Sequence, residues 1–272
     1  GDVYKRQPLP SPSPDSRALI TGASQGIGMA IARDLAKQGH HVILVARRKD
    51  VLEQFAAELT SRYNVTAEVF PCDLSDEQQR HKLIADIKDR DISIIINSAG
   101  IASFGPFMDQ EWEYETNQFE LNATAVFELT RAVLPRMLAN RKGAILNVGS
   151  AAGNLPIPNN ATYVFTKAGV NVFTEALHYE LKGSGVSCTL LAPGPVRDAV
   201  IPEEEKSIVD KVVPDFLWTT YESCAKESLE ALAKNKRRVV PGPLSKVLNV
   251  ASLVAPRGIA SPLIGSFYKK MS

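Results

Sequence analysis

Thr21-Gly22-Ala23-Ser24-Gln25-Gly26-Ile27-Gly28 is the stretch that decides the fold. It ends the apolar run RALITG (17–22), which predicts a buried strand, and it opens a segment with helical spacing from 27 to 38. Glycines permit a tight turn against a pyrophosphate, and a helix N-terminus offers that anion free N–H groups. Taken alone, the motif is equally typical of a strand-to-helix turn without a ligand. Its place after the first strand of a strand–helix–strand unit favours dinucleotide binding.

The same alternation continues along the chain. Further short apolar runs predict strands at 41–46, within 66–74, and at 92–97, 143–149, 186–192 and 237–241, with helices at 27–38, 50–63, 76–88, 111–141 and 161–182 between them. Continuous apolar strands that alternate with helices indicate a parallel sheet covered on both faces. We therefore predict one α/β domain of the Rossmann type, with seven parallel strands, over residues 17–242. Residues 1–16 are expected to be an extended lead-in, of which 1–7 lack an initiator Met and periodicity and are treated as a non-native remnant.

Charge is distributed unevenly. The 272 residues hold 31 Lys and Arg against 30 Asp and Glu, and this balance argues against a strongly basic nucleic-acid-binding protein. However, residues 1–230 carry 23 basic and 30 acidic residues, whereas 231–272 carry eight bases and no acid. The extension 243–272 mixes bases with apolar residues, which suits either peripheral contact with an anionic bilayer or a packing arm at a subunit contact.

Three cysteines, Cys72, Cys188 and Cys224, are far apart and lack the spacing of zinc ligands or a disulfide framework. We expect no metal site and a reducing cytoplasm. No apolar run reaches the ~18 residues of a membrane span.

Two positions after neighbouring strands concern the cofactor. Arg47 and Arg48 follow the second strand, where an NAD-preferring site usually holds an acid, and guanidinium groups can grip a 2′-phosphate. The pattern favours NADP(H) over NAD(H); an exposed arginine pair is the alternative. Asp73, after the third strand, is placed to meet an adenine amino group, or else belongs to a helix N-cap.

Tyr163 and Lys167 stand four residues apart on a predicted helix and therefore share a face. A nearby ammonium lowers the pKa of a tyrosine, which suits proton transfer at neutral pH. Ser150, at the end of the fifth strand, can hydrogen-bond a substrate carbonyl. Alone, Tyr-x-x-x-Lys is common and means little.

Two asparagines stand in apolar surroundings. Asn97, in Asn97-Ser98-Ala99-Gly100 after the fourth strand, can tie neighbouring strands. Asn122, in a helical stretch, can hold a water that relays protons to Lys167. For each, a satisfied buried amide is the alternative.

Together these motifs resemble the short-chain dehydrogenase/reductase family, in order and at family spacing from Arg17 to about Pro241. The resemblance implies the strand order 3-2-1-4-5-6-7 and a catalytic tetrad of Asn122, Ser150, Tyr163 and Lys167. Tyr163 would be the general acid, with Lys167 lowering its pKa and binding the nicotinamide ribose. The implied cofactor-binding residues are Gly22, Ser24, Gln25, Gly26, Ile27, Gly28, Arg47, Arg48, Asp73, Leu74, Asn97, Ala99, Gly100, Tyr163, Lys167, Pro193, Gly194 and Val196.

The chain departs from the family pattern at two positions. Ser98 stands where the family usually has a second Asn, and Asp198 where it usually has Thr in the loop after Pro193-Gly194. An Asp still accepts from a carboxamide but adds charge near the cofactor phosphates.

A narrower resemblance concerns the substrate. The stretches SAAGNLPIPNNATY (150–163), LAPGPVR (191–197), VPDFLW (213–218), RRVVPG (237–242) and GSFYKKM (265–271) look like the mycolate reductases of actinobacteria that make mycolic acids. That resemblance implies NADPH-dependent reduction of the 3-oxo group of a long-chain, α-alkyl-β-oxo acyl lipid in mycolic acid biosynthesis. The loop 151–160 and the apolar segment 199–217 would line the substrate site, although the latter equally suits core under a lid.

Two other functions remain open at this point. One is an NADP-linked dehydrogenase of a steroid, retinoid or other lipid-like alcohol, and the other is a non-catalytic dinucleotide-binding regulator. The family further implies a homo-dimer or homo-tetramer formed through the helices near Asn122 and Tyr163. We expect no nucleic-acid partner and a cytoplasmic protein, working at the inner face of the plasma membrane if the extension binds lipid.

Overall fold

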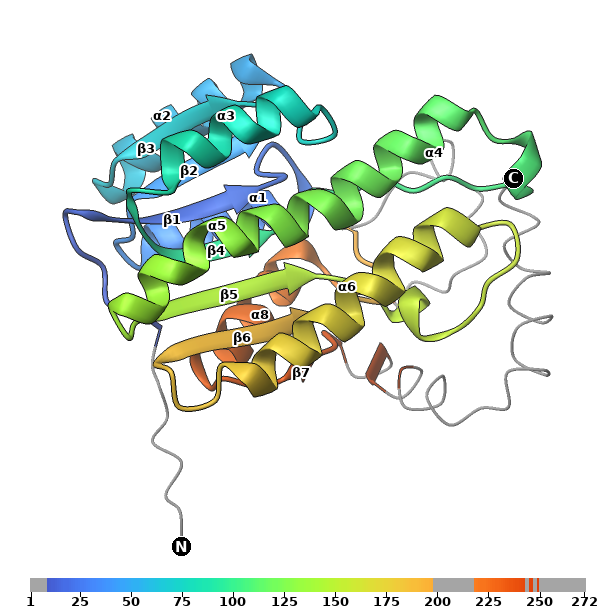
Figure 1. Cartoon of the computed structure of the whole chain (residues 1–272). Coiled ribbons are helices and arrows are strands. Elements are labelled where there is room, and N and C mark those ends of the chain that lie inside the picture. The colour runs from blue at the N-terminus through green and yellow to red at the C-terminus, as the bar shows by residue number, and fades with distance from the viewer. Residues whose placement is uncertain (1–8, 198–217, 243–244, 247–248, 250–272) are drawn as a thin grey trace, which may run out of the picture.

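The computed structural model describes residues 9–197, 218–242, 245–246 and 249. Seven parallel strands form one sheet in the order β3-β2-β1-β4-β5-β6-β7 (Figure 1). The strands are β1 (Ser16–Thr21), β2 (Val42–Ala46), β3 (Ala67–Pro71), β4 (Asp91–Asn97), β5 (Gly143–Val148), β6 (Val186–Leu191) and β7 (Arg238–Val239). The predicted α/β fold, its seven strands and their order are confirmed, and the seventh strand is shorter than predicted.

The helices lie on both faces of this sheet. They are α1 (Gly26–Lys37), α2 (Lys49–Tyr63), α3 (Glu77–Ile87), α4 (Trp112–Phe119), α5 (Ala125–Ala139), α6 (Ala161–Glu180) and α8 (Tyr221–Ala233), with 3-10 turns at Phe107–Asp109 and Ala151–Asn154. The single helix predicted over 111–141 is instead two helices, α4 and α5, joined by a π-helical turn at Glu120–Thr124. Such turns inside helices are frequent at functional sites.

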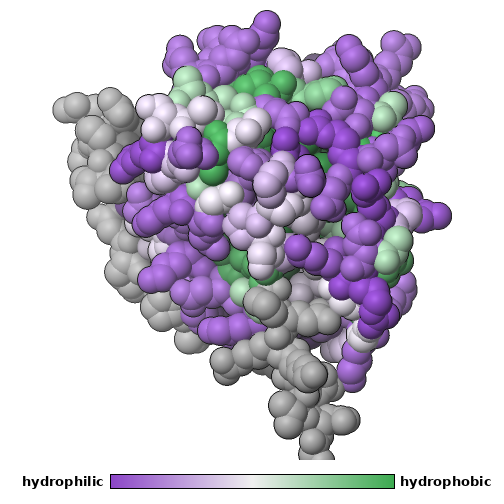
Figure 2. Space-filling view, turned by 90° about the vertical axis from the view of Figure 1, so that its left-hand side faces the viewer, coloured by the Kyte–Doolittle hydropathy of each residue, from purple (hydrophilic) through white to green (hydrophobic). Residues whose placement is uncertain are grey.

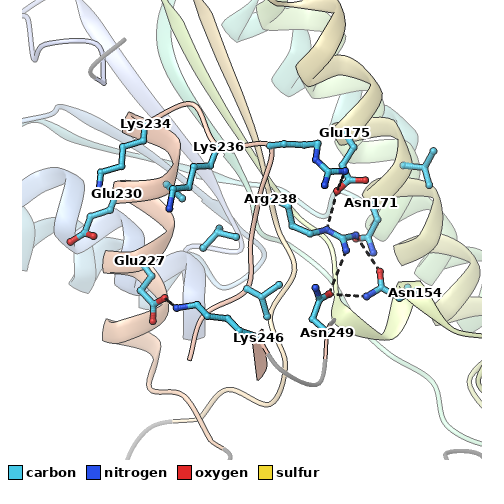
Figure 3. Close-up of a pocket in the computed structure, with 16 residues that line it drawn as sticks. Asn154, Asn171, Glu175, Glu227, Glu230, Lys234, Lys236, Arg238, Lys246 and Asn249 are labelled. Atoms are coloured by element: carbon cyan, nitrogen blue, oxygen red, sulfur yellow. Dashed lines mark hydrogen bonds and ion pairs between the residues drawn. The ribbon is translucent and has the colours of Figure 1, made fainter. Parts of the chain in front are cut away.

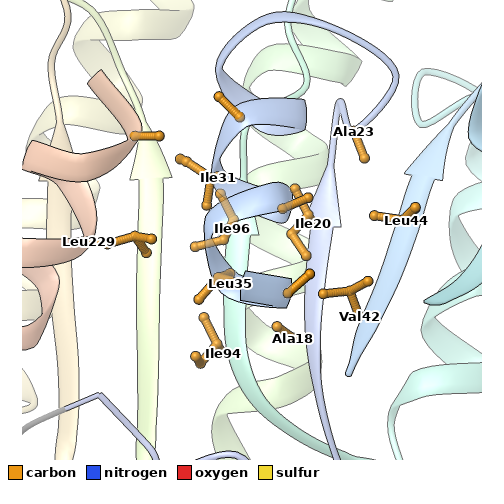
Figure 4. Close-up of a cluster of buried hydrophobic side chains, with 14 of the residues drawn as sticks. Ala18, Ile20, Ala23, Ile31, Leu35, Val42, Leu44, Ile94, Ile96 and Leu229 are labelled. Atoms are coloured by element: carbon orange, nitrogen blue, oxygen red, sulfur yellow. The ribbon is translucent and has the colours of Figure 1, made fainter. Parts of the chain in front are cut away.

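Successive side chains of each strand enter opposite cores. Ile20, Leu44 and Ile96 pack with α1, α2 and α8, as Figure 4 shows for the first of these cores. Leu19, Ile43 and Ile95 pack on the other face with α3, α5 and α6. All six side chains are at most 1% exposed. Because both faces are covered, the central strands β1, β2, β4 and β5 are mainly apolar, which is the pattern that identified them in the sequence.

The face of the molecule in Figure 2 carries mainly hydrophilic side chains with small apolar patches between them. Within the described part of the chain, no helix is long and apolar enough to cross a membrane. The carboxyl ends of the parallel strands meet at one edge of the sheet. The chain reverses its direction of winding between β1 and β4, so a crevice opens at that edge where ligands bind in open α/β sheets.

Candidate active site

The turn between β1 and α1 is built from backbone. Gly22 and Gly26 have φ values of +67° and +58°, which favour glycine. A Cβ at Gly28 would lie 2.5 Å from the carbonyl oxygen of Gly22, so no larger residue fits there without movement. Helix α1 starts at Gly26 without a side-chain cap and without an acid in its first turn. Its first N–H groups therefore point out of the helix as an anion site.

A cavity of about 470 Å³ opens over this turn. Its lining includes twelve of the predicted cofactor-binding residues: Gly22, Ser24, Gln25, Gly26, Ile27, Gly28, Arg47, Arg48, Asp73, Leu74, Ala99 and Gly100. The glycine cradle, the uncapped helix end and the arginine pair at its rim all suit the adenosine and pyrophosphate portion of a dinucleotide.

Arg48 reaches across the mouth of this cavity. Its guanidinium donates to Gln25 Oε1 at 2.7 Å, to Ser24 Oγ at 3.1 Å and to the Ser24 carbonyl at 3.2 Å. Both Arg47 and Arg48 are exposed. Ser24 and Gln25 of the turn therefore hold the Arg48 guanidinium beside the cavity. Both partners are neutral, so a ligand phosphate can replace them.

Asp73 and Asn97 have different surroundings. The Asp73 carboxylate lines the cavity and accepts from the amide (3.0 Å) and hydroxyl (2.7 Å) of Ser75, while Asp76 is the N-cap of α3. Asn97 is buried and donates to Asn147 Oδ1 at 2.8 Å and to Thr130 Oγ1 at 3.2 Å. It lies outside the cavity lining, so the structure supports its predicted tie between strands rather than contact with a cofactor.

Ser150, Tyr163 and Lys167 come together beyond the inner end of this cavity. The Ser150 side chain lies close enough to the Tyr163 hydroxyl to lower its pKa. The Lys167 ammonium lies 5.8 Å from the centroid of the Tyr163 ring and donates to the carbonyl of Val148 at 2.9 Å. Val148 itself lines the cavity, so the three side chains stand where a substrate can meet a bound cofactor.

The pKa values at this site follow from burial. Burial raises the pKa of Tyr163 above 10.0, and the nearby Ser150 side chain only partly offsets the rise. This direction is opposite to the lowered pKa that the sequence predicted, because Lys167 lies beside the ring and holds a carbonyl rather than the phenolic oxygen. Burial also lowers the pKa of Lys167 from 10.5 to about 8. Tyr163 is therefore a protonated acid at neutral pH in the protein alone.

Asn122 lies in the π-helical turn and is fully buried. Its Oδ1 accepts from the Ile101 N–H at 2.9 Å, and its Nδ2 donates to the Ile101 carbonyl at 2.8 Å and to Thr166 Oγ1 at 3.2 Å. A Cβ at Gly100 would lie 3.2 Å from Asn122 Oδ1 and 3.3 Å from Lys167 Nζ. The structure thus brings Asn122 and Lys167 against the same glycine, while the water relay stays a prediction.

The loop after β6 touches the Ser150 loop from the other side. The Pro193 carbonyl accepts from the Ala151 N–H at 3.1 Å, and Val196 forms a bridge with Thr219. A Cβ at Gly194 would crowd the hydroxyl of Ser245 at 2.6 Å. Pro193 therefore adjoins the Ser150 loop, whereas Pro193, Gly194 and Val196 all lie outside the lining of the cavity over the glycine turn. Asp198, the segment 199–217 and most of 243–272 lie outside the described residues.

Sequence reasoning missed three residues of the site. Thr21 Oγ1 accepts from the N–H groups of Ser98 and Ala99 at 3.0 and 3.1 Å and so joins β1 to the loop after β4. Tyr221, at the start of α8, closes the cavity near Gly26. Asn171, one turn after Lys167, holds the backbone of Ser150. The only available signal was for Asn171, a polar residue on the same helix face as Tyr163 and Lys167.

A larger cavity of about 720 Å³ lies beside β7 (Figure 3) and contains no predicted site residue. Glu175 pairs with Arg237 at 3.1 Å and with Arg238 at 3.0 Å, and Lys246 pairs with Glu227 at 2.8 Å. This cavity keeps an excess of positive charge, with five cations against three carboxylates in its lining, but none of the candidate catalytic residues lines it, so we assign the chemistry to the smaller cavity.

The Rossmann-type fold, the dinucleotide-sized cavity and the Ser150, Tyr163 and Lys167 group are typical of an oxidoreductase that uses a nicotinamide cofactor. Comparison with known proteins supports this class. The sequence profile of the family described as short chain dehydrogenase matches residues 16–207. The chain belongs to the short-chain dehydrogenase/reductase family. Within that family, it is 37% identical over 181 residues to the very-long-chain 3-oxoacyl-CoA reductase of Anas platyrhynchos, a match that covers 65% of this chain and 58% of the relative. The chain thus spans less than two thirds of that relative.

Two solved structures extend the comparison over nearly the whole chain. A 7β-hydroxysteroid dehydrogenase superposes with a TM-score of 0.83 at 25% identity, covering 92% of this chain and 96% of the other. A short-chain dehydrogenase from Sphingobium yanoikuyae in complex with NADPH gives 0.75 at 27% identity, covering 94% of each. The family assignment is therefore shown by sequence and structure alike.

Proposed function

We propose that this chain is an NADPH-dependent reductase that acts on the 3-oxo group of a long-chain β-oxo acyl lipid, in the manner of a mycolate reductase. The observation that carries the proposal is that the side chains of Ser150, Tyr163 and Lys167 lie next to one another, beside a cavity suited to a dinucleotide. This group of side chains also argues against a regulator without catalytic activity.

The residues divide the work of carbonyl reduction among themselves. When bound, NADPH supplies a hydride to the substrate carbonyl carbon. Ser150 and Tyr163 donate hydrogen bonds to the carbonyl oxygen and stabilise the negative charge that develops on it. Tyr163 then gives its proton to that oxygen, which its raised pKa permits because the hydroxyl is protonated at neutral pH. Lys167, protonated below about pH 8, adds positive charge next to the phenol as the proton leaves.

Arg47 and Arg48 support the preference for NADPH. Both line the cavity at the end of β2, a position where an acid would bind the ribose 2′-hydroxyl of NAD. Arg48 is already oriented by Ser24 and Gln25. The structural neighbour from Sphingobium yanoikuyae was solved in complex with NADPH, which also supports this preference.

The proposal of an acyl substrate is supported by the relatives of this chain and by the loop that follows Ser150. The relative from Anas platyrhynchos is named for a very-long-chain 3-oxoacyl thioester. In the loop after Ser150, Leu155 and Ile157 are buried, and residues 151–160 include no cation that would suit a small anionic substrate. The α-alkyl branch of the mycolate reductase substrate follows from the resemblance of residues 150–163 and 191–197.

The test is NADPH oxidation against α-alkyl-β-keto esters and thioesters of rising chain length. We expect kcat/KM to rise with chain length and to be higher with NADPH than with NADH. Activity confined to small polar ketones would contradict the lipid substrate. The structural match to a 7β-hydroxysteroid dehydrogenase favours one second candidate, oxidation or reduction of a steroid-like alcohol. A steroid panel in the same assay separates the two.

Self-association and membrane contact are also proposed. Exposed aromatic side chains on α5 and α6, namely Phe127, Phe165 and Tyr179, suit a homo-oligomer formed through these helices. For residues 243–272 we propose peripheral contact with the inner face of the plasma membrane, supported by their bases and apolar residues. A variant truncated after 242 should lose sedimentation with anionic vesicles; loss of the oligomer with unchanged sedimentation would favour a packing arm instead.

A further inference from the structure

Asn171 holds the backbone of Ser150 from both sides. It lies on α6, four residues after Lys167 and eight after Tyr163, and is 2% exposed. Its Oδ1 accepts from the Ser150 N–H at 3.2 Å, and its Nδ2 donates to the Ser150 carbonyl at 2.9 Å. One amide side chain thus uses both its acceptor and its donor on one residue of the candidate site.

Ser150 needs such a partner because it leaves the sheet. The pairing of β5 with β6 ends at Val148, and the backbone bonds beyond it, from the Gly149 N–H to the Leu191 carbonyl at 2.8 Å and from the Ala151 N–H to the Pro193 carbonyl at 3.1 Å, skip Ser150. Ser150 is buried, and its own N–H and carbonyl face α6 instead of a strand. Buried backbone groups must find partners. Asn171 supplies the partner of the Ser150 N–H, and it shares the Ser150 carbonyl with the Gly153 N–H, which donates to it at 3.1 Å.

The neighbouring loop makes room for this amide. A Cβ at Gly149 would overlap Oδ1 of Asn171, and a Cβ at Gly153 would lie 2.7 Å from its Nδ2. Two glycines therefore flank Ser150 at the places where a larger residue would displace the side chain of Asn171. Neither glycine has a positive φ, so close approach rather than turn geometry explains them.

Two further contacts join the same stripe of α6 to the end of β5. Lys167 donates to the Val148 carbonyl at 2.9 Å, and Thr174 Oγ1 accepts from Asn147 Nδ2 at 3.1 Å. Of these contacts, only that of Asn171 acts on Ser150. A hydroxyl pair such as Ser150 and Tyr163 must be placed to a fraction of an ångström for a reacting carbonyl.

We propose that Asn171 is a positioning residue that sets Ser150 against Tyr163 and thereby against the substrate carbonyl. The proposal rests on the proposed function, in which Ser150 binds that carbonyl. A purely structural role for Asn171 would stabilise the protein without acting through Ser150.

A double-mutant cycle separates these roles. Asn171→Leu should lower kcat by about tenfold or more, with the NADPH dissociation constant within about twofold of wild type. In a Ser150→Ala background, the same substitution should lower kcat by less than about twofold, because there is no hydroxyl left to position. Equal losses in both backgrounds would overturn the proposal. Asn171→Asp keeps the acceptor for the Ser150 N–H, so it should lower kcat by less than Asn171→Leu. It replaces the leucine variant in the same cycle if that variant does not fold.

Hydrogen–deuterium exchange tests the contact without substrate or cofactor. The Ser150 amide should exchange at least about tenfold faster in the Asn171 variants. Thr174→Val is the matched control, since it removes a buried polar contact of the same helix that does not reach Ser150. Unchanged exchange at Ser150, or equal acceleration in the control, would contradict the proposal. Failure of the proposed function would differ: Ser150→Ala would keep full turnover, or wild type would reduce no carbonyl, while the exchange result would stand.

Discussion

The two halves of the candidate site are built in different ways. The turn between β1 and α1 uses eight consecutive residues, and its shape depends on the positive φ values of Gly22 and Gly26 and on the small size of Gly28. The region after β5 uses side chains from the β5 loop, the π-helical turn and α6, which are held by buried amides. The first is a backbone cradle whose changes should affect cofactor affinity. The second is a side-chain assembly whose changes should affect turnover.

The largest effect on turnover is expected from a substitution in the side-chain half of the site. Tyr163→Phe removes the acid and one hydrogen bond to the developing oxyanion, so we expect kcat to fall at least about 10²-fold. Steady-state NADPH oxidation measures the loss, and NADPH fluorescence should give a dissociation constant within about twofold of wild type. Near-normal turnover would overturn the assignment of Tyr163. A combined loss of affinity and turnover would show that the two halves are not separable.

Burial of Lys167, in the side-chain half, can be tested through the pH dependence of the free energy of unfolding. Its folded-state pKa of about 8 is below the ordinary 10.5, so between these pH values the unfolded chain binds more protons. Stability of wild type should therefore rise relative to Lys167→Met as the pH increases from 8 to 10.5, by up to about 3 kcal/mol. Urea denaturation at several pH values measures the difference. Lys82→Met, at an exposed position, is the control and should show no such trend. A constant difference for Lys167→Met would contradict burial of the ammonium.

The same contrast explains what could be predicted from the sequence. The strands and the glycine turn are read from contiguous residues, because apolar runs and glycine spacing report directly on burial and backbone conformation. The π-helical turn was not predicted, since five residues of i→i+5 bonding leave the apolar period of 111–141 almost unchanged. Asn97 was assigned to the cofactor from its motif, yet it turns into the core towards Asn147.

The tertiary contacts of the side-chain half could not be predicted from the sequence. The motif brought Tyr163, Lys167 and Ser150 together, but it gave the wrong direction for the pKa of Tyr163. That direction depends on where the ammonium of Lys167 points, and in the fold it binds the Val148 carbonyl. Tyr221 and Thr21 likewise meet the site only through packing, with no local pattern that marks them.

Gly28→Ala tests the backbone half. The new Cβ would lie 2.5 Å from the Gly22 carbonyl oxygen and 2.9 Å from its carbon, so the turn must shift. We expect NADPH affinity to fall by about tenfold or more, which corresponds to about 1.4 kcal/mol. Isothermal titration calorimetry measures it. Gly169→Ala is the control, because nothing lies within 4 Å of its Cβ; in a helix it should keep affinity and add roughly 0.5–1 kcal/mol of stability. Unchanged affinity in Gly28→Ala would show that the turn does not hold the cofactor.

The smallest expected effect is on cofactor affinity, at the edge of the backbone half where the Arg48 side chain lies beside the turn. Arg48→Ala removes an exposed guanidinium that is held by Ser24 and Gln25, so we expect a loss of about fivefold to tenfold in NADPH affinity and almost none for NADH. Titration with both cofactors measures the ratio, and Arg62→Ala, which removes an equal exposed charge at the far end of α2, is the control. Equal losses for both cofactors would place Arg48 on the shared pyrophosphate. Because the 2′-phosphate is the only difference between the two ligands, the ratio isolates the one contribution to cofactor binding that the glycine backbone cannot make.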